Sequence, residues 1–115
     1  MLGVFMSRRT RRQTLQAKLQ ELCPHVYFQP PASISMSYPC FVFSYQDDTK
    51  FHADDKPYFV FDRYSITYIT KEAYPTDVLD ALDAIRYCDF DRHYTSDNLH
   101  HFSYRIVLSE RIQND

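Results

Sequence analysis

The stretch from Tyr87 to Leu108, YCDFDRHYTSDNLHHFSYRIVL, decides the fold of this chain, because apolar and polar residues alternate along two successive segments of it. A period of two indicates β-strands that turn one face to a core and the other to water or a partner. The residues between the segments, Thr95-Ser96-Asp97-Asn98, are types that bond their own backbone and tolerate a positive φ. The stretch therefore predicts an antiparallel hairpin with a connection longer than two residues.

The alternation also predicts which side chains of this hairpin share a face. In the second segment, one face is predicted to carry Phe102, Tyr104, Ile106 and Leu108. The first segment places Cys88, Phe90, Arg92 and Tyr94 on one face, and Asp89, Asp91 and His93 on the other. On this interpretation Cys88 and His93 point to opposite faces, which argues against a nucleophile–base pair formed by them.

Two helices and three further strands are expected in the rest of the chain. A narrow apolar stripe at helical spacing (Leu15, Leu19 and Leu22) predicts a helix that Ser7 or Thr10 caps and that runs to about Leu22. Strand patterns cover Val26–Gln29, Cys40–Tyr45 and Phe59–Ile69. A second helix opens at Pro75-Thr76-Asp77, where an acidic residue suits the helix dipole.

The order helix, strand, strand, strand, helix, strand, strand predicts an α+β fold with two layers. We expect a mostly antiparallel sheet of about five strands with two helices on one side. A length of 115 residues indicates a single domain. Within it, residues 1–9 are expected to form a flexible start and residues 109–115 a flexible tail.

The composition excludes several classes of protein. Glycine occurs once, as Gly3, so neither a P-loop nor a dinucleotide-binding loop can be built. A formal net charge of −2 argues against general nucleic-acid binding. No apolar run approaches membrane-spanning length. The three cysteines (Cys23, Cys40 and Cys88) lie in or beside apolar runs, which predicts buried free thiols in a reducing compartment.

Aromatic residues make up 17% of the chain, with ten tyrosines and nine phenylalanines. Tyrosine is favoured where a surface must be both packed and wet, so its excess indicates an interface. The alternative is that a small sheet favours aromatic residues for its own packing.

Two runs of this sequence, FDRHYTSDNLHH (residues 90–101) and YFQPPASISMSYPCFVF (residues 27–43), resemble a family of small neck proteins of long-tailed bacteriophages. These proteins are known variously as tail completion, tail terminator or minor capsid proteins, and the resemblance covers roughly residues 26 to 108. It attaches no chemical mechanism to either run. It therefore implies a virion structural protein and no enzyme, with no catalytic, cofactor-binding or metal-binding residues.

By the same resemblance, the protein forms a homo-oligomeric ring, a hexamer in this family, on the last layer of the tail tube. The ring stops tube growth and docks to the head connector or stopper protein, and genomic DNA passes through its lumen without specific binding. Assembly takes place in the cytoplasm of the host bacterium, and no membrane partner is implied. The alternative within the class is a head-completion protein of the stopper type. Two alternatives come from other functional classes. The first is a small DNA-binding regulator, and the least favoured is a metal-dependent hydrolase.

Residues Gln46–Pro57, QDDTKFHADDKP, are expected to form a long polar loop that orders on assembly. Phe51 is its one large apolar anchor, and aromatic anchors carry much of the binding energy of interfaces. His52, Asp54, Asp55 and Lys56 complete the candidate docking element. The alternative is that Phe51 folds back onto its own sheet and the loop is merely solvated.

Four arginines at the first expected helix (Arg8, Arg9, Arg11 and Arg12) oppose the helix dipole, and a local conflict of this kind can mark function. They form a candidate contact surface for DNA or an acidic partner. The alternative is a frayed, solvated helix end.

Five histidines raise the question of a metal site: His25, His52, His93, His100 and His101. Adjacent residues of a strand point to opposite faces, so His100 and His101 cannot both bind one ion. The favoured interpretation is that these histidines form hydrogen bonds at the turn. The alternative is a metal site formed by His93, either His100 or His101, and either Asp91 or Asp97. The Asp54-Asp55-Lys56 run only crudely matches a metal-dependent nuclease, which needs its acids and lysine held on ordered strands.

Overall fold

The computed structural model describes residues 7–53 and 56–111. Two helices and five strands follow one another in the predicted order: α1 (Arg8–Gln20), β1 (Val26–Phe28), β2 (Cys40–Ala53), β3 (Lys56–Thr70), α2 (Thr76–Asp83), β4 (Cys88–Ser96) and β5 (Leu99–Arg111). The strands form one sheet in the order β1-β2-β3-β5-β4. Only the short β1 pairs in parallel, with β2, and the other three pairings are antiparallel. The predicted α+β fold with a mostly antiparallel sheet is therefore confirmed.

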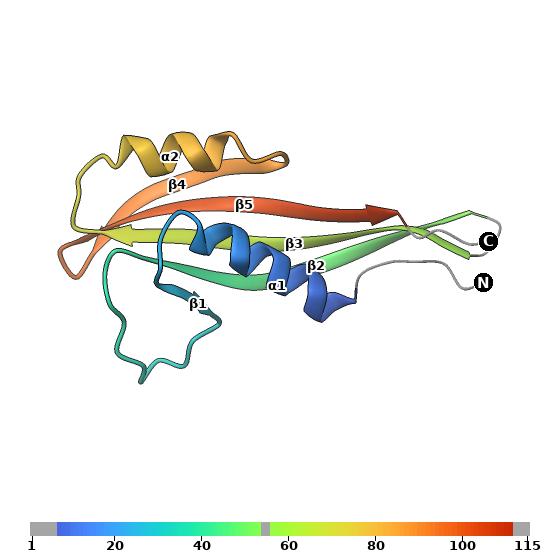
Figure 1. Cartoon of the computed structure of the whole chain (residues 1–115), viewed down its shortest axis with the longest axis horizontal. Coiled ribbons are helices and arrows are strands. Elements are labelled where there is room, and N and C mark those ends of the chain that lie inside the picture. Colours follow the sequence, from blue (N-terminus) through green and yellow to red (C-terminus); the bar gives the residue numbers. More distant parts are fainter. Residues whose placement is uncertain (1–6, 54–55, 112–115) are drawn as a thin grey trace.

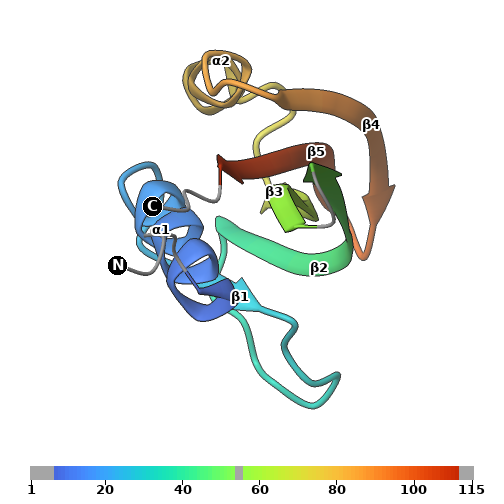
Figure 2. The same ribbon diagram turned by 90° about the vertical axis from the view of Figure 1, so that its right-hand side faces the viewer.

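Both helices lie on one side of the curved sheet (Figure 2). Each helix contributes two leucines to the core, Leu15 and Leu19 from α1 and Leu79 and Leu82 from α2. They pack on the sheet face that carries the largest buried side chains, among them Phe41, Phe43, Ile66 and Tyr104. One face of the sheet is thus covered by two separate helices, as the alternating patterns predict.

Helix α1 begins where its sequence signals indicate. The backbone N–H of Thr10 donates a hydrogen bond of 3.2 Å to the hydroxyl of Ser7, which is the N-cap residue. The helix ends at Gln20, two residues before the expected end. Arg8 and Arg9 are the first two residues of the helix, and Arg11 is its first buried residue.

The expected loop Gln46–Pro57 is instead the end of a long hairpin, which projects along the long axis of the molecule (Figure 1). Strand β2 continues to Ala53 after a bulge between Tyr45 and Asp47, and β3 starts at Lys56. The prediction was wrong because polarity shows only that a segment is exposed. The backbone ladder forms there regardless, and it is supported by a hydrogen bond of 2.9 Å from Arg63 to Asp47.

The β4–β5 hairpin is confirmed, but its connection is a two-residue turn and not a longer one. Ser96 pairs with Leu99, and the turn residues Asp97 and Asn98 have φ of 54° and 64°. Two successive positive φ values are the signature of the tight turn that matches the twist of a hairpin. Strand β5 continues to Arg111, beyond the expected start of the tail, because its end pairs with β3.

A bulge in β4 changes which residues share a face. The register shifts between Phe90 and Arg92, so His93 pairs with Phe102 on the helix-covered face, together with Phe90 and not opposite to it. Arg92 and Tyr94 move to the other face. The expected face assignment is wrong from Arg92 onward, because one extra residue in a strand inverts the alternation that follows it.

Candidate functional site

The candidate docking residues lie at the far end of the β2–β3 hairpin. Phe51 and His52 are near the end of β2, where Phe51 pairs with Phe59, and Lys56 is the first residue of β3. Asp54 and Asp55 lie outside the described residues. The hairpin therefore brings the predicted docking element to one extremity of a molecule measuring 52 × 28 × 21 Å.

The N-terminal arginines are largely engaged by the protein itself. Arg11 forms an ion pair with Asp62 of β3, and the two side chains are only 5% and 1% exposed. A buried arginine–carboxylate pair is retained only when its geometry offsets the loss of hydration. Arg11 is thus a structural residue that fixes α1 to the sheet.

Arg8 and Arg12 also contact the sheet. Arg8 forms an ion pair with Asp48 and donates a hydrogen bond of 3.1 Å to the hydroxyl of Tyr45. Arg12 lies 4.8 Å from the ring centroid of Phe28, a cation–π distance. Arg9 is exposed. All four arginines belong to helix α1, and the side chains of Arg8 and Arg9 are exposed.

The histidines of the β4–β5 hairpin interact with each other and with aromatic rings. Nε2 of His93 lies 3.0 Å from Nδ1 of His100, and the His93 ring stacks on Phe102 at 4.6 Å between centroids. His101 stacks on Tyr94 on the opposite face, at 4.7 Å. Within residues 7–53 and 56–111, no group of three or more His, Cys, Asp or Glu side chains is placed to hold a metal ion. The hydrogen bonding favoured for this turn is present between His93 and His100, and the ring stacking is an addition that the sequence did not predict.

The three cysteines are buried and unpaired, as predicted. Burial raises the pKa of Cys40 to about 11 and that of Cys88 to about 11, so both thiols are protonated at neutral pH. The bulge places Cys88 and His93 on the same face, contrary to the expectation, but Phe90 lies between them along the strand. A protonated, buried thiol is a poor nucleophile.

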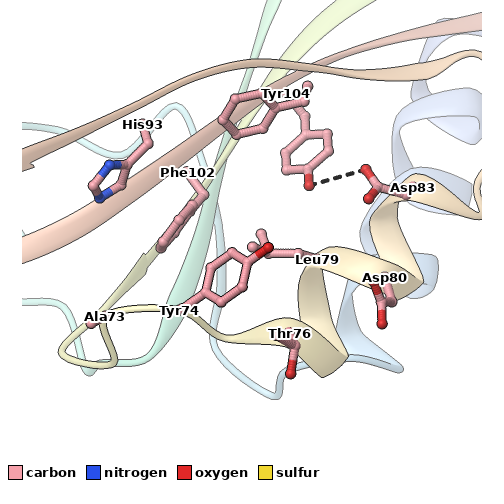
Figure 3. Close-up of a pocket in the computed structure, with 10 residues that line it drawn as sticks. Ala73, Tyr74, Thr76, Leu79, Asp80, Asp83, His93, Phe102 and Tyr104 are labelled. Carbon is pink, nitrogen blue, oxygen red and sulfur yellow. Dashed lines mark hydrogen bonds between the residues drawn. The ribbon is translucent and has the colours of Figure 1, made fainter.

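A groove of about 390 Å³ opens between α2, the segment before it and the β4–β5 hairpin. Its walls are rich in aromatic side chains: Tyr74, Phe90, His93, Phe102 and Tyr104. Tyr74 is 70% and Phe90 is 50% exposed, whereas Phe102 and Tyr104 are buried. Figure 3 shows His93 and Phe102 on the sheet side and Thr76 and Asp80 on the helix side. We call this feature the aromatic groove.

Carboxylates line the helix side of the aromatic groove. The hydroxyl of Tyr104 donates a hydrogen bond of 3.2 Å to Asp83, and burial, with the charge of Asp83, raises the pKa of Tyr104 well above its usual range. Asp80 is exposed one helical turn earlier. The groove can therefore hold an apolar or aromatic side chain beside a cationic group.

Sequence reasoning did not find the aromatic groove. The excess of tyrosine indicated an interface, but it did not indicate where on the molecule that interface lies. The groove depends on the bulge in β4, which turns His93 toward Phe102, and on the placement of Tyr74 between β3 and α2. Neither can be read from the local alternation of residues.

No protein-family model matches the sequence, and no curated protein matches it either. No helix among the described residues is long and apolar enough to cross a membrane.

Proposed function

We propose that the chain is a structural subunit of a bacteriophage neck, most similar to a tail terminator, that forms a ring on the tail tube and docks to the head connector. The two quoted runs that resemble this family support the proposal, and the small α+β fold is compatible with it. The mechanism is self-assembly and docking.

The observation that carries the proposal is the exposed aromatic edge of the sheet. Strand β4 is the last strand on its side, and of its nine residues all but Cys88 are exposed. Phe90, on the helix-covered face, and Tyr94, on the other face, are among the exposed residues. An edge strand with exposed aromatic residues favours association, and natural monomers protect such edges.

The projecting β2–β3 hairpin supports the docking part of the proposal. In a ring subunit the lateral sides contact neighbouring subunits, so an element that extends along the long axis is free to reach the next layer. Phe51, His52 and Lys56 lie near the end of this element. We propose that they contact the tail-tube protein or the head connector.

Electron microscopy of the purified protein, alone and mixed with tail tubes, tests the proposal. Annular particles, free or on the tube end, are expected. A protein that stays monomeric by light scattering at high concentration and never decorates tubes would contradict it. Binding to connectors but not to tubes would place the protein on the head side, as a stopper-type completion protein.

A further inference from the structure

Exposed large apolar residues occur at two places in the described part of the chain. One set lies on the β4 side of the molecule: Tyr74 and Phe90 line the aromatic groove, Tyr94 lies on the other face of β4, and Tyr87 directly precedes β4, outside the groove. The other set, Ile34 and Tyr38, lies on the connection between β1 and β2. This connection, residues 29–39, projects from the body of the molecule (Figure 2). We call it the projecting loop.

The two places lie at opposite sides of the sheet. The sheet order puts β4 at one edge and β1 at the other. Along the long axis, however, the projecting loop and the N-terminal end of α2 occupy the same end of the molecule (Figure 1). A simple sideways displacement of a second copy therefore brings its projecting loop next to the aromatic groove of the first.

The charges of the two sides are complementary. Helix α1, on the β1 side, carries five basic residues and no acidic residue. Arg8 and Arg11 are ion-paired with Asp48 and Asp62, and of the other three, Arg9 and Lys18 are exposed. Helix α2, on the β4 side, carries three aspartates and no basic residue, and all three are exposed. The adjoining strand β4 adds Asp89, whereas Asp91 already forms an ion pair with Arg105 of β5. Opposite charge on the two sides favours contact between unlike sides and opposes contact between like sides.

We infer that a second copy of this chain occupies the aromatic groove, through its projecting loop, with its basic α1 facing the acidic α2 and β4 of the first copy. Ile34 and Tyr38 of the incoming copy supply the apolar side chains. The contact joins two different surfaces, so each subunit keeps one free donor and one free acceptor side, and repetition closes into a ring when the rotation permits. The inference rests on the ring assembly of the proposed function and names its subunit contact.

Two exposed substitutions test the inference in the full-length chain. Tyr74→Asp disables the groove and Ile34→Asp disables the projecting loop. Each variant alone is expected to be monomeric in analytical ultracentrifugation at concentrations where the wild type assembles. Lys50→Asp, a change at an exposed residue of β2 that belongs to neither the aromatic groove nor the projecting loop, is the matched control and should assemble like the wild type. Urea unfolding of each variant checks that its fold is intact.

An equimolar mixture of the two disabled variants gives the sharpest result. The intact loop of Tyr74→Asp can enter the intact groove of Ile34→Asp, so a dimer with one copy of each, and nothing larger, is expected. Raising the salt concentration should weaken this dimer, because its charges lie near the surface. A mixture that stays monomeric, assembly unchanged in either single variant, or a wild type that is monomeric at every concentration would overturn the inference.

The proposed function is tested separately, by the binding of the wild type and the variants to tail tubes. If wild type and both variants form rings on tubes equally well, the subunit contact is wrong but the neck function stands. If the mixture gives the expected dimer and no form of the protein binds tubes or connectors, the contact is right and the neck function fails.

Discussion

The guanidinium of Arg11 on α1 lies against the carboxylate of Asp62 on β3, and both side chains are buried. The two residues are 51 positions apart in the sequence, so the pair joins the first helix to the centre of the sheet. It also accounts for one of the four arginines that made the start of the chain a candidate binding surface.

Removing one member of this pair should be strongly destabilising. Arg11→Ala or Asp62→Ala leaves a buried charge without its partner, and a loss of about 3–5 kcal/mol in the free energy of unfolding is expected. The double variant Arg11→Met/Asp62→Leu removes both charges and should recover most of that loss. Urea denaturation measures all three, and losses that simply add in the double variant would show that the charges act independently.

The turn of the β4–β5 hairpin predicts a contrast between two substitutions of one residue. Asn98 has a φ of 64°, which a β-branched residue adopts only with strain. Asn98→Val should reduce the free energy of unfolding by about 1–2 kcal/mol. Asn98→Gly, which adopts this φ without strain, should be neutral or stabilising. Equal effects of the two in thermal unfolding would contradict the tight turn.

The buried thiols predict a pH dependence of stability. Burial raises the pKa of Cys40 and Cys88 from 9.0 to about 11, so the native state holds these protons more tightly than the unfolded state. Their contribution to stability is complete below about pH 9 and is lost as the pH rises to about 11. Urea midpoints should fall over this range, and Cys88→Ser should reduce the slope. A midpoint independent of pH from 9 to 11 would refute the assignment.

Binding of duplex DNA should be weak at physiological salt. Arg8, Arg11 and Arg12 already contact Asp48, Asp62 and Phe28, so few phosphate contacts remain. The binding constant can be measured by fluorescence anisotropy with a labelled duplex at several salt concentrations. The logarithm of the binding constant falls with the logarithm of the salt concentration by about one per phosphate contact, so a small slope is expected. Arg9→Ala should remove much of any residual binding. Tight, sequence-selective binding at physiological salt would favour the DNA-binding regulator over the neck protein.

Phe51 tests the docking role of the β2–β3 hairpin. Phe51→Ala should change the free energy of unfolding by about 1 kcal/mol or less, as expected for one cross-strand pair, and yet reduce the yield of joined heads and tails. Phe51→Tyr, which keeps the ring, is the matched control. A core-like loss of about 3 kcal/mol, or normal virion assembly, would show that Phe51 serves the fold and not docking.

The candidate surfaces were only partly predictable. The sequence pointed to the hairpin end and to the arginines through residue type, because exposed charge and an isolated aromatic residue are visible locally. It could not show that Arg11 forms an ion pair with Asp62, since that contact depends on how α1 crosses the sheet. The aromatic groove was missed for the same reason: its walls come from α2, the segment before it and two strands.

The sequence by itself determined the order of the elements, the apolar face of β5, a helix cap at Ser7 or Thr10 and the burial of the cysteines. Each of these follows from the spacing of residue types over a few positions. Only the tertiary structure decided that β2 and β3 extend through the polar segment, and that a bulge at Asp91 turns His93 toward Phe102. Strand length and register depend on hydrogen bonds to a neighbouring strand that is distant in sequence, and a shift of one residue inverts every face that follows.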